Sequence, residues 1–394
     1  MINQSLDHCC GCGACMAICP KAAIAMQEDG CGYTYPSVDH AKCIECGLCE
    51  RICPEITHPD LSAPLSVYAA CSGDGIERIS CASGGAATVL GRAVIRRGGV
   101  VYGCSQKNYR TIRHIRVDRE EALNLLKGSK YVQSDMTGIY AEVQNDLLSG
   151  RMVLFVGTPC QGGALRRYLR KQYANLCIVD LVCHGVPSQS MLRRSVEEVL
   201  NSTEDVFVNF RWKTQFGIQF GIQFGEKCQI VKTVPAAQSA YMTAFLSGLS
   251  YRENCHRCQY SRHERVGDIT IGDFWDLGKD SPSGIDPRGG VSLVMVNTDL
   301  GMELWKLVEE SFTAEKRTFE EAVKYNWNLH DPSPRPAAKD KFLEMYPAQG
   351  MEAAVRACSR RYRIETTPLI RFVRRVPILN HAAGMAKRFV RKIF

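Results

Sequence analysis

The sequence predicts an α/β protein with a cysteine-rich module at its N-terminus and a basic helical segment at its C-terminus. Three observations lead to this prediction: a cysteine pattern repeated within the first 57 residues, apolar runs alternating with helical patterns from about residue 67, and a cluster of Lys and Arg after residue 359. A chain of 394 residues is too long for one ordinary core, so we expect two or three domains.

The composition excludes several classes of protein. Hydrophobic residues make up 45% of the chain and charged residues 23%, which excludes a disordered, collagen-like or coiled-coil protein. We expect no transmembrane helix, because no run of 18 uncharged apolar residues occurs, and no secretory signal. The 20 cysteines therefore indicate metal or redox chemistry in a reducing cytoplasm rather than disulfides.

The N-terminal module, residues 1–57, contains one cysteine pattern twice. Each copy reads C-x2-C-x2-C-x3-C-P. This is the spacing of two-cluster bacterial ferredoxins, in which three thiolates of one run hold one 4Fe-4S cluster and the fourth holds the other. We therefore predict two clusters with crossed ligand sets: Cys9, Cys12, Cys15 and Cys53 for the first, and Cys43, Cys46, Cys49 and Cys19 for the second.

Zinc is the alternative metal for these thiolates. Zinc takes four ligands per ion, commonly in paired C-x2-C arms, so two complete ferredoxin patterns in tandem favour the clusters. Cys10 and Cys31 fall outside the pattern, and we predict that they are not ligands. Residues 58–66 contain two prolines and small polar residues, and we interpret them as a linker.

The body of the chain shows strand and helix patterns in alternation, which favours a partly parallel sheet. Short apolar runs predict buried strands at 100–103, 152–156, 176–182, 268–272 and 291–296. Helical patterns occur at 86–97, 161–171 and 188–200. The period-two pattern at 216–224 predicts a half-buried antiparallel strand. After a loop at 281–290, the chain is expected to be mainly helical beyond residue 299.

Four further cysteines stand at predicted strand ends or in a C-x2-C pair. Cys160 and Cys183 each follow a predicted strand, and Cys255 and Cys258 form the pair. Neighbouring parallel strands end at the same edge of a sheet, so the pair could close over the other two thiols and complete a third cluster site. Buried cysteines that pack as small hydrophobic side chains are the alternative.

Six short motifs follow one another between residues 67 and 297. They are S-G-G at 83–85, G-S-K-Y-V-Q-S at 128–134, G-T-P-C-Q at 157–161, C-H-G-V-P-S at 183–188, C-x2-C at 255–258 and G-D-F-W at 272–275. In this order they resemble the beta subunit of coenzyme F420 (deazaflavin) hydrogenases and dehydrogenases, a family similar to chlorophyll-pathway reductases.

The resemblance implies a mixed α/β core that binds FAD in a non-Rossmann manner. We expect a flavin-binding domain at 67–145 and a second domain at 146–335, where Cys160, Cys183, Cys255 and Cys258 would hold a third 4Fe-4S cluster. The ferredoxin module would be attached in front of this core. The basic helical tail, 336–394, lies outside the resemblance.

Two of these motifs would form the flavin site. The S-G-G turn precedes a predicted helix whose N–H groups suit a pyrophosphate, although a plain helix cap is the alternative. Residues 129–134 offer a cation, an aromatic face and polar groups, unless they form a surface strand with the lysine outward. The predicted flavin contacts are Ser83, Gly84, Gly85, Ser129, Lys130, Tyr131, Gln133 and Ser134.

We assign catalytic roles to Lys130 and His184, with a structural role as the alternative for His184. Asp273 and Trp275 either serve the site or anchor a strand end.

An iron–sulfur cluster passes one electron at a time, whereas a flavin accepts two. The sequence therefore predicts an iron–sulfur flavin-dependent oxidoreductase that connects a one-electron donor to a two-electron acceptor. We expect a redox partner protein or ferredoxin and a small-molecule acceptor. The alternatives are an electron-transfer subunit without its own substrate site, and a cluster-bearing sensor or scaffold.

The positive charge of the chain is concentrated in its tail. Residues 360–394 carry ten basic side chains and one acidic one, which leaves the rest of the chain nearly neutral and gives no reason to predict nucleic-acid binding. Two basic amphipathic helices separated by Pro377 fit an anionic membrane surface, here the inner face of the cytoplasmic membrane. Docking on an acidic partner or on the protein's own body is the alternative.

Overall fold

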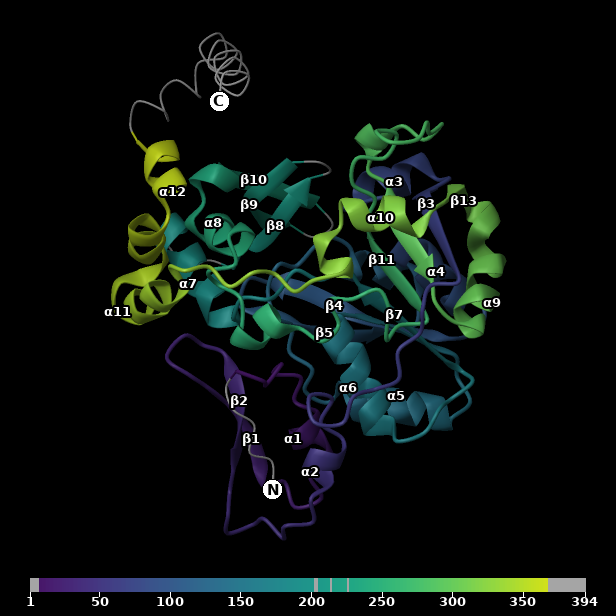
Figure 1. Cartoon of the computed structure of the whole chain (residues 1–394), viewed down its shortest axis with the longest axis horizontal. Helices are drawn as coiled ribbons and strands as arrows, with labels where there is room; N and C mark the ends of the chain where they lie inside the picture. The colour runs from purple at the N-terminus through teal and green to yellow at the C-terminus, as the bar shows by residue number, and fades with distance from the viewer. Residues whose placement is uncertain (1–6, 202–204, 213–214, 225–226, 368–394) are drawn as a thin grey trace.

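An eight-stranded mixed sheet organises the chain (Figure 1). The computed structural model describes residues 7–201, 205–212, 215–224 and 227–367. The strand order is β13-β3-β12-β11-β7-β6-β4-β5. The strands are β3 (Ser66–Ser72), β4 (Val100–Asn108), β5 (Thr111–Val117), β6 (Val153–Gly157), β7 (Leu176–Leu181), β11 (Ile269–Asp273), β12 (Ser292–Val296) and β13 (Phe312–Arg317).

The middle of this sheet is parallel and its two flanks are antiparallel. Strands β4, β6, β7 and β11 pair in parallel, so their carboxyl ends meet at one edge. Strands β6 and β7 are buried along almost their whole length, as expected for parallel strands covered on both faces. The predicted strands at 152–156 and 176–182 are therefore confirmed. Strands from both expected core domains lie in this one sheet.

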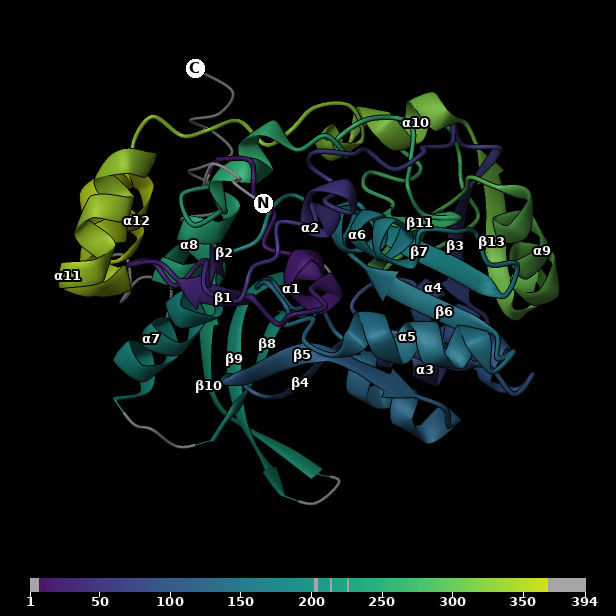
Figure 2. The same cartoon turned by 90° about the horizontal axis from the view of Figure 1, so that it is seen from below.

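Side-chain alternation along the strands divides the apolar core into two layers. Leu154 belongs to the cluster beneath α4 (Ala86–Ile95) and α9 (Asp299–Val308). Its neighbour Phe155 points the other way, into the cluster beneath α5 (Ile139–Leu148) and α6 (Pro159–Leu169). Figure 2 shows α5 and α6 together on one face of the sheet.

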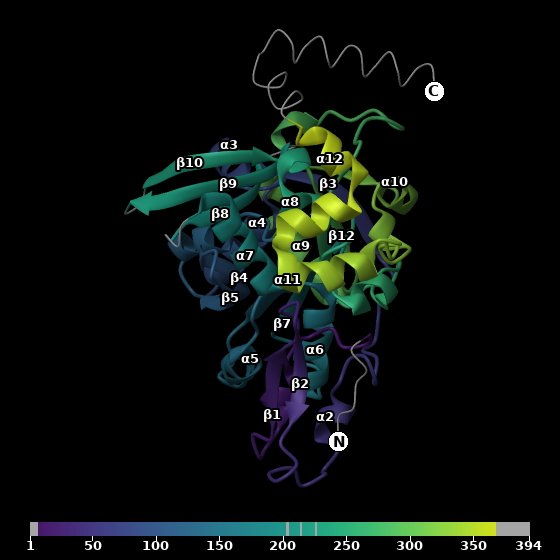
Figure 3. The ribbon, with the colours of Figure 1, turned by 90° about the vertical axis from the view of Figure 1, so that its left-hand side faces the viewer.

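A second, smaller sheet stands beside the first and has its own core. Strands β8 (Phe207–Trp212), β9 (Gln215–Phe224) and β10 (Lys227–Pro235) form an antiparallel meander, which confirms the strand predicted at 216–224. Helices pack around it, and the two that come last in the chain face the viewer in Figure 3. These helices are α7 (Gln189–Leu200), α8 (Ala240–Leu246), α11 (Lys339–Cys358) and α12 (Arg360–Glu365).

The N-terminal module projects from the main sheet, at the bottom of Figure 1. It consists of a hairpin, β1 (Ile24–Glu28) and β2 (Thr34–Val38), and two single-turn helices, α1 (Ala14–Ile18) and α2 (Leu48–Arg51). Equivalent glycines of the two repeats start these helices in the left-handed region, with φ of 73° at Gly13 and 66° at Gly47. The repeat in sequence is thus a repeat in structure.

Short elements complete the described chain. They are α3 (Gly75–Ser80), α10 (Phe319–Lys324) and the 3-10 helices η1 (Glu120–Leu126), η2 (Ala236–Gln238), η3 (Glu253–Arg257), η4 (Pro287–Gly289), η5 (Glu309–Ser311) and η6 (Trp327–Leu329). No helix in the described ranges is long and apolar enough to cross a bilayer.

The described chain after residue 299 is mainly helical, as expected, and β13 is the exception. This strand pairs with β3 at the edge of the sheet, and only its first residue is buried. A charged edge strand lacks the apolar pattern that identifies a central strand. In the tail, helix α12 is described, whereas residues 368–394, which contain both predicted amphipathic helices, lie outside the described residues.

A buried ion pair fixes the segment after Cys258 to the main sheet. The Arg265 guanidinium donates to the Asp180 carboxylate of β7 at 3.2 Å and to the Tyr260 carbonyl at 2.8 Å. Both charged side chains are almost fully buried, with exposures of 1% and 0%. The second Asp180 oxygen accepts from the Gly267 amide, so the pair is well satisfied.

Removal of one partner should be costly because it leaves the other charge buried and unpaired. We expect Arg265→Met to lower the free energy of unfolding by about 3–5 kcal/mol, measured by anaerobic urea denaturation. Arg288→Met removes an arginine that is 89% exposed in its pair with Asp286 and should leave stability unchanged. Equal midpoints for the two variants would contradict this account of the buried pair.

Candidate metal centre

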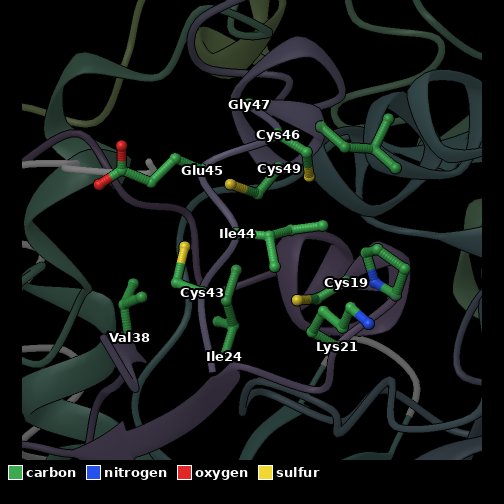
Figure 4. A pocket seen from close by; sticks show the side chains of 12 residues that line it. Cys19, Lys21, Ile24, Val38, Cys43, Ile44, Glu45, Cys46, Gly47 and Cys49 are labelled. Carbon is green, nitrogen blue, oxygen red and sulfur yellow. The ribbon is translucent and has the colours of Figure 1, made fainter. Parts of the chain in front are cut away.

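The first cavity of the N-terminal module lies among four cysteines (Figure 4). Cys19 comes from the first repeat, and Cys43, Cys46 and Cys49 come from the second. Cys46 is exposed, so this set of thiols reaches the protein surface.

The second cavity lies among the other four cysteines of the repeats. Its lining includes Cys9, Cys12, Cys15 and Cys53. Cys15 and Cys53 are buried, so this set lies deeper than the first. The structure thus brings together the two crossed sets that the spacing predicts.

The chemistry of both cavities fits a cluster bound by thiolates. Backbone N–H groups point at sulfur atoms, from Gly11 to Cys9 at 3.4 Å and from Ala23 to Cys19 at 3.3 Å, as suits a cluster whose charge is stabilised by hydrogen bonds to sulfur. Burial raises the pKa of Cys9 to about 11 and also raises that of Cys15. Cluster binding at this set must therefore release protons.

The two sets share an apolar wall. Cys15, Cys53 and Ile24 form a small buried cluster, and Cys19 and Cys49 of the surface set pack against it. The two cavities are therefore neighbours, with one set at the surface and the other towards the core.

A third set of thiols lies where the main sheet meets the C-x2-C pair. Cys160 is in the first turn of α6, Cys183 follows β7, and Cys255 and Cys258 lie in and after η3. The thiol of Cys183 is within electrostatic range of the other three. Burial raises the pKa of Cys255 to about 11 and that of Cys258 to about 12.

Cys160 differs from the rest of its set. Hydrogen bonds with Cys10 and then with Thr158 lower the pKa of Cys160 despite its burial, and its sulfur lies 3.2 Å from the Thr158 hydroxyl. Across the described ranges, no three Cys, His, Asp or Glu side chains converge as they would around a single metal ion. A cubane cluster is larger than an ion and holds its ligand sulfurs farther apart.

A buried arginine docks the N-terminal module on the core. Arg252 is 0% exposed and donates to the carbonyls of Thr34 and Cys9, at 3.0 and 3.4 Å. It also donates to the Gln133 side chain, whose amide in turn donates to the carbonyls of Cys10 and Gly11. Three of these contacts, at Cys9, Cys10 and Gly11, fix the loop before α1, and the contact at Thr34 fixes the start of β2.

Close packing at Gly11 accompanies this docking. A Cβ atom at Gly11 would lie 2.5 Å from the Arg252 guanidinium, and its φ of 66° also favours glycine. Asn254 and Tyr140 complete the contact by donating to the carbonyls of His8 and Cys12. Sequence reasoning missed Arg252, because no local pattern distinguishes it from a surface arginine.

The G-T-P-C-Q motif connects the third set to a buried hydrogen-bond chain. Thr158 caps α6, and its N–H and hydroxyl both donate to the Gln161 side-chain oxygen at 3.0 Å. The Thr158 hydroxyl also lies 3.2 Å from the Cys160 sulfur, so the residue that caps α6 contacts the third set.

The chain continues to a histidine whose tautomer is determined. Gln161 donates to Ser134, and Ser134 bonds to Nδ1 of His114 at 2.8 Å. Nε2 of His114 faces the Val156 carbonyl at 3.0 Å, and because a carbonyl only accepts, Nε2 carries the proton. Burial lowers the pKa of His114 to about 4, so the ring is neutral at pH 7.

Several predicted flavin contacts already have protein partners. The Ser83 hydroxyl donates to the Val291 carbonyl, and a Cβ atom at Gly84 would lie 2.3 Å from the Ala70 carbonyl oxygen. Gln133 docks the N-terminal module, and Ser134 belongs to the His114 chain. These residues thus take part in hydrogen bonds and close packing within the protein.

The other predicted flavin residues lie elsewhere in the core. Gly85 starts α4 with a φ of 95°. Tyr131 stacks on Phe245 with ring centroids 4.5 Å apart, and the side chain of Ser129 forms a hydrogen bond with that of Tyr131. In this structure these residues contribute to packing and to the start of α4. The prediction that they contact a flavin rests on the family resemblance.

The two predicted catalytic residues lie in different surroundings. The Lys130 ammonium donates to the carbonyls of Leu126 and Lys127, and the segment around it is a loop rather than a strand. Burial lowers the pKa of Lys130 to about 8. His184 is exposed, and its backbone carbonyl accepts from Ser333.

The G-D-F-W motif joins the two sheets. Asp273 ends β11 and forms an ion pair with Arg211 of β8. The Arg211 guanidinium lies 5.1 Å from the Phe216 ring and 5.3 Å from the Trp275 ring. Of the two roles considered for Asp273 and Trp275, the structure thus shows anchoring of a strand end.

The geometry defines an iron–sulfur protein: a ferredoxin-type module docked on a mixed α/β core. Comparison with known families identifies both parts. Residues 8–56 match the 4Fe-4S dicluster domain, and residues 150–322 match the family described as the C terminus of the coenzyme F420 hydrogenase/dehydrogenase beta subunit. The family resemblance found in the sequence is thereby confirmed over these ranges.

Two further comparisons were made. None of the curated proteins matches the chain. Among solved structures, a chain of the F420-reducing [NiFe] hydrogenase complex from Methanosarcina barkeri, determined in a xenon-derivatization study, is 20% identical. The match covers 66% of this protein and 84% of that chain, with a TM-score of 0.44.

The buried His114 should make stability depend on pH. In the unfolded chain the imidazole of His114 becomes protonated near pH 6.5, whereas in the folded protein it becomes protonated only near pH 4. The free energy of unfolding therefore falls as the pH falls between these values. From pH 7 to pH 5, the wild type should lose about 2 kcal/mol more than His114→Gln in urea unfolding. His40→Gln, at an exposed histidine, should follow the wild type. Parallel losses in all three proteins would contradict the neutral, buried ring.

Proposed function

We propose that this protein is an iron–sulfur oxidoreductase that passes single electrons from its surface to a two-electron centre in its core. The observation that supports this most is the order of the three thiol sets. The set that contains Cys46 lies at the surface and shares an apolar wall with the deeper set, which contains Cys12. The deeper set in turn adjoins Cys160, a member of the third set. Bound clusters would supply one-electron transfer along this series.

The surface set is the natural entry point for a redox partner protein. Cys46 is exposed and Ile44 beside it is 58% exposed, so a partner can approach this set closely. The deeper set, by contrast, is covered by the core through Arg252 and Gln133. An electron that enters at the surface is therefore directed inward.

The two-electron centre proposed for the core is FAD, and its support is the family resemblance. A flavin would collect two electrons singly and pass them to a small-molecule acceptor. His184 is exposed directly after Cys183, where it can reach a substrate. Lys130, with a pKa of about 8, can give up a proton near neutral pH. We propose these two side chains as the proton-handling groups.

Iron content tests the assignment of the three sets. Anaerobically purified protein should contain about twelve iron atoms per chain. The double variant Cys255→Ala/Cys258→Ala should retain about eight, and Cys46→Ser should lose up to about four by opening the surface set. Cys358→Ala, a half-buried cysteine of α11, is the matched control and should lose none.

The iron and flavin contents of the same preparations also distinguish the oxidoreductase from the alternative functions. Wild-type protein with only about eight iron atoms would contradict the third cluster, and unchanged iron in Cys46→Ser would contradict the surface ligand set. About twelve iron atoms without flavin would indicate an electron-transfer subunit or a cluster-bearing scaffold rather than a complete oxidoreductase.

We also propose that the basic tail binds an anionic membrane surface. Helix α12 docks on the protein's own body, since Tyr362 is buried and its hydroxyl bonds to Glu352 of α11. Beyond it, residues 368–394 contain seven basic side chains and no acidic one. Near an anionic surface, each basic residue contributes on the order of 1 kcal/mol.

Truncation after residue 367 separates the tail from α12, whose packing must be preserved. The full chain should pellet with vesicles containing phosphatidylserine, and salt should weaken the binding because it is electrostatic. The truncated chain should remain in the supernatant. Equal pelleting of the two proteins, or binding that is insensitive to salt, would contradict the membrane proposal.

A further inference from the structure

The guanidinium of Arg252 is fully buried, and the hydrogen bonds that it donates go to neutral groups. Its acceptors are the carbonyl oxygens of Cys9 and Thr34 and the side-chain oxygen of Gln133. These bonds satisfy its donors, but none of them brings an opposite charge. A buried cation is strongly unfavourable unless an anion lies near it, so this environment calls for an anion.

No carboxylate of the described chain fills this need. Among the described residues, Arg252 forms no ion pair with Asp or Glu. Glu253, the next residue, pairs with Arg335 at 2.6 Å and with Lys339 at 4.0 Å. Glu55, which lines the deeper cavity, accepts a hydrogen bond from Gln259 at 3.1 Å.

The guanidinium lies directly against the cysteine loop of the deeper set. The Gly11 N–H donates to the Cys9 sulfur at 3.4 Å, and a Cβ atom at Gly11 would lie 2.5 Å from a guanidinium nitrogen. The backbone of one residue thus separates the cation from the sulfur of a predicted cluster ligand. Four thiolates make a bound cluster an anion, so a cluster in the deeper set would supply the missing charge.

The main chain of Arg252 belongs to the core and is fixed beside the third set. Its N–H donates to the Val186 carbonyl at 3.0 Å, and its own carbonyl accepts from the Cys255 N–H at 3.0 Å. The core therefore contributes the cation, and the cation reaches the deeper set only because the N-terminal module is docked there.

We propose that Arg252 is the counter-charge of the cluster in the deeper set and raises the reduction potential of that cluster. Reduction adds one negative charge to the cluster, and a buried cation stabilises this charge because little water screens it. Arg252 is thus a residue of the core that tunes a centre of the module, and it is not a ligand.

The consequence for electron flow rests on the proposed function. One electron leaves the cluster of the surface set, which is oxidised, and enters the cluster of the deeper set, which is reduced. No proton moves and no bond to Arg252 forms or breaks. A higher potential at the deeper set favours this inward step.

The test uses full-length protein purified anaerobically with its clusters. Arg252→Gln removes the charge and keeps hydrogen-bonding groups, whereas Arg252→Lys keeps a charge and loses the planar set of donors. Arg257→Gln is the matched control, because this arginine of the same segment is 54% exposed, so water and salt screen its charge. Iron content is measured first, and the midpoint potential of each cluster is then measured by EPR-monitored redox titration.

We expect the cluster of the deeper set to become harder to reduce in Arg252→Gln. The equilibrium constant for its taking an electron from the cluster of the surface set should fall at least about tenfold, which corresponds to about 59 mV. The cluster of the surface set is an internal reference, and its potential should stay unchanged. Arg252→Lys and Arg257→Gln should keep the wild-type difference between the two clusters.

Three results would overturn the inference. The first is an unchanged potential difference in Arg252→Gln with full iron content. The second is an equal shift in Arg252→Gln and Arg252→Lys, which would assign the effect to the docking hydrogen bonds instead of the charge. The third is loss of about four iron atoms in both variants, which would have the same meaning.

Loss of about four iron atoms in Arg252→Gln alone would support the counter-charge, because the variant that keeps the cation keeps the cluster. About eight iron atoms in the wild type would contradict the third cluster and the proposed series. The Arg252 variants would still decide this inference, since the deeper set lies in the N-terminal module.

Discussion

The burial of one guanidinium, that of Arg252, is the constraint on which the arrangement of this protein depends. A buried charge is tolerated only when its donors are satisfied, and here they point at backbone carbonyls of the N-terminal module and at the Gln133 side chain. The rings of Tyr33 and Tyr35, at 5.3 and 4.7 Å, cover the cation. Because these partners belong both to the N-terminal module and to the core, the module can dock in only one orientation, which places Cys10 beside Cys160.

The parallel sheet supplies the other half of this arrangement. Strands β6 and β7 are neighbours, so the segments that follow them leave the same edge and carry Cys160 and Cys183 to one place. Cys160 also lies in the first turn of α6, where the helix dipole favours a thiolate. The Arg265–Asp180 pair then holds the segment after Cys258 against β7. Secondary structure thus converts four distant cysteines into one set.

Local patterns could be predicted from the sequence, and long-range contacts could not. The crossed sets of the module follow from spacing within a short repeat, and the buried strands β6 and β7 follow from continuous apolar runs. By contrast, the sequence suggests a flavin contact for Gln133, which instead contacts the module, because its partners are more than a hundred residues away. Cys10 lies outside the ferredoxin spacing, so its place between two sets is visible only in the fold.

The central claim is that three iron–sulfur centres form one series from the surface to the core. Crystals of the anaerobically purified protein, measured at the iron absorption edge, test it most directly. The account predicts three anomalous peaks, at the set with Cys46, at the set with Cys12 and at the set with Cys160, in that spatial order. Two peaks confined to the N-terminal module, with none at Cys160, would contradict it.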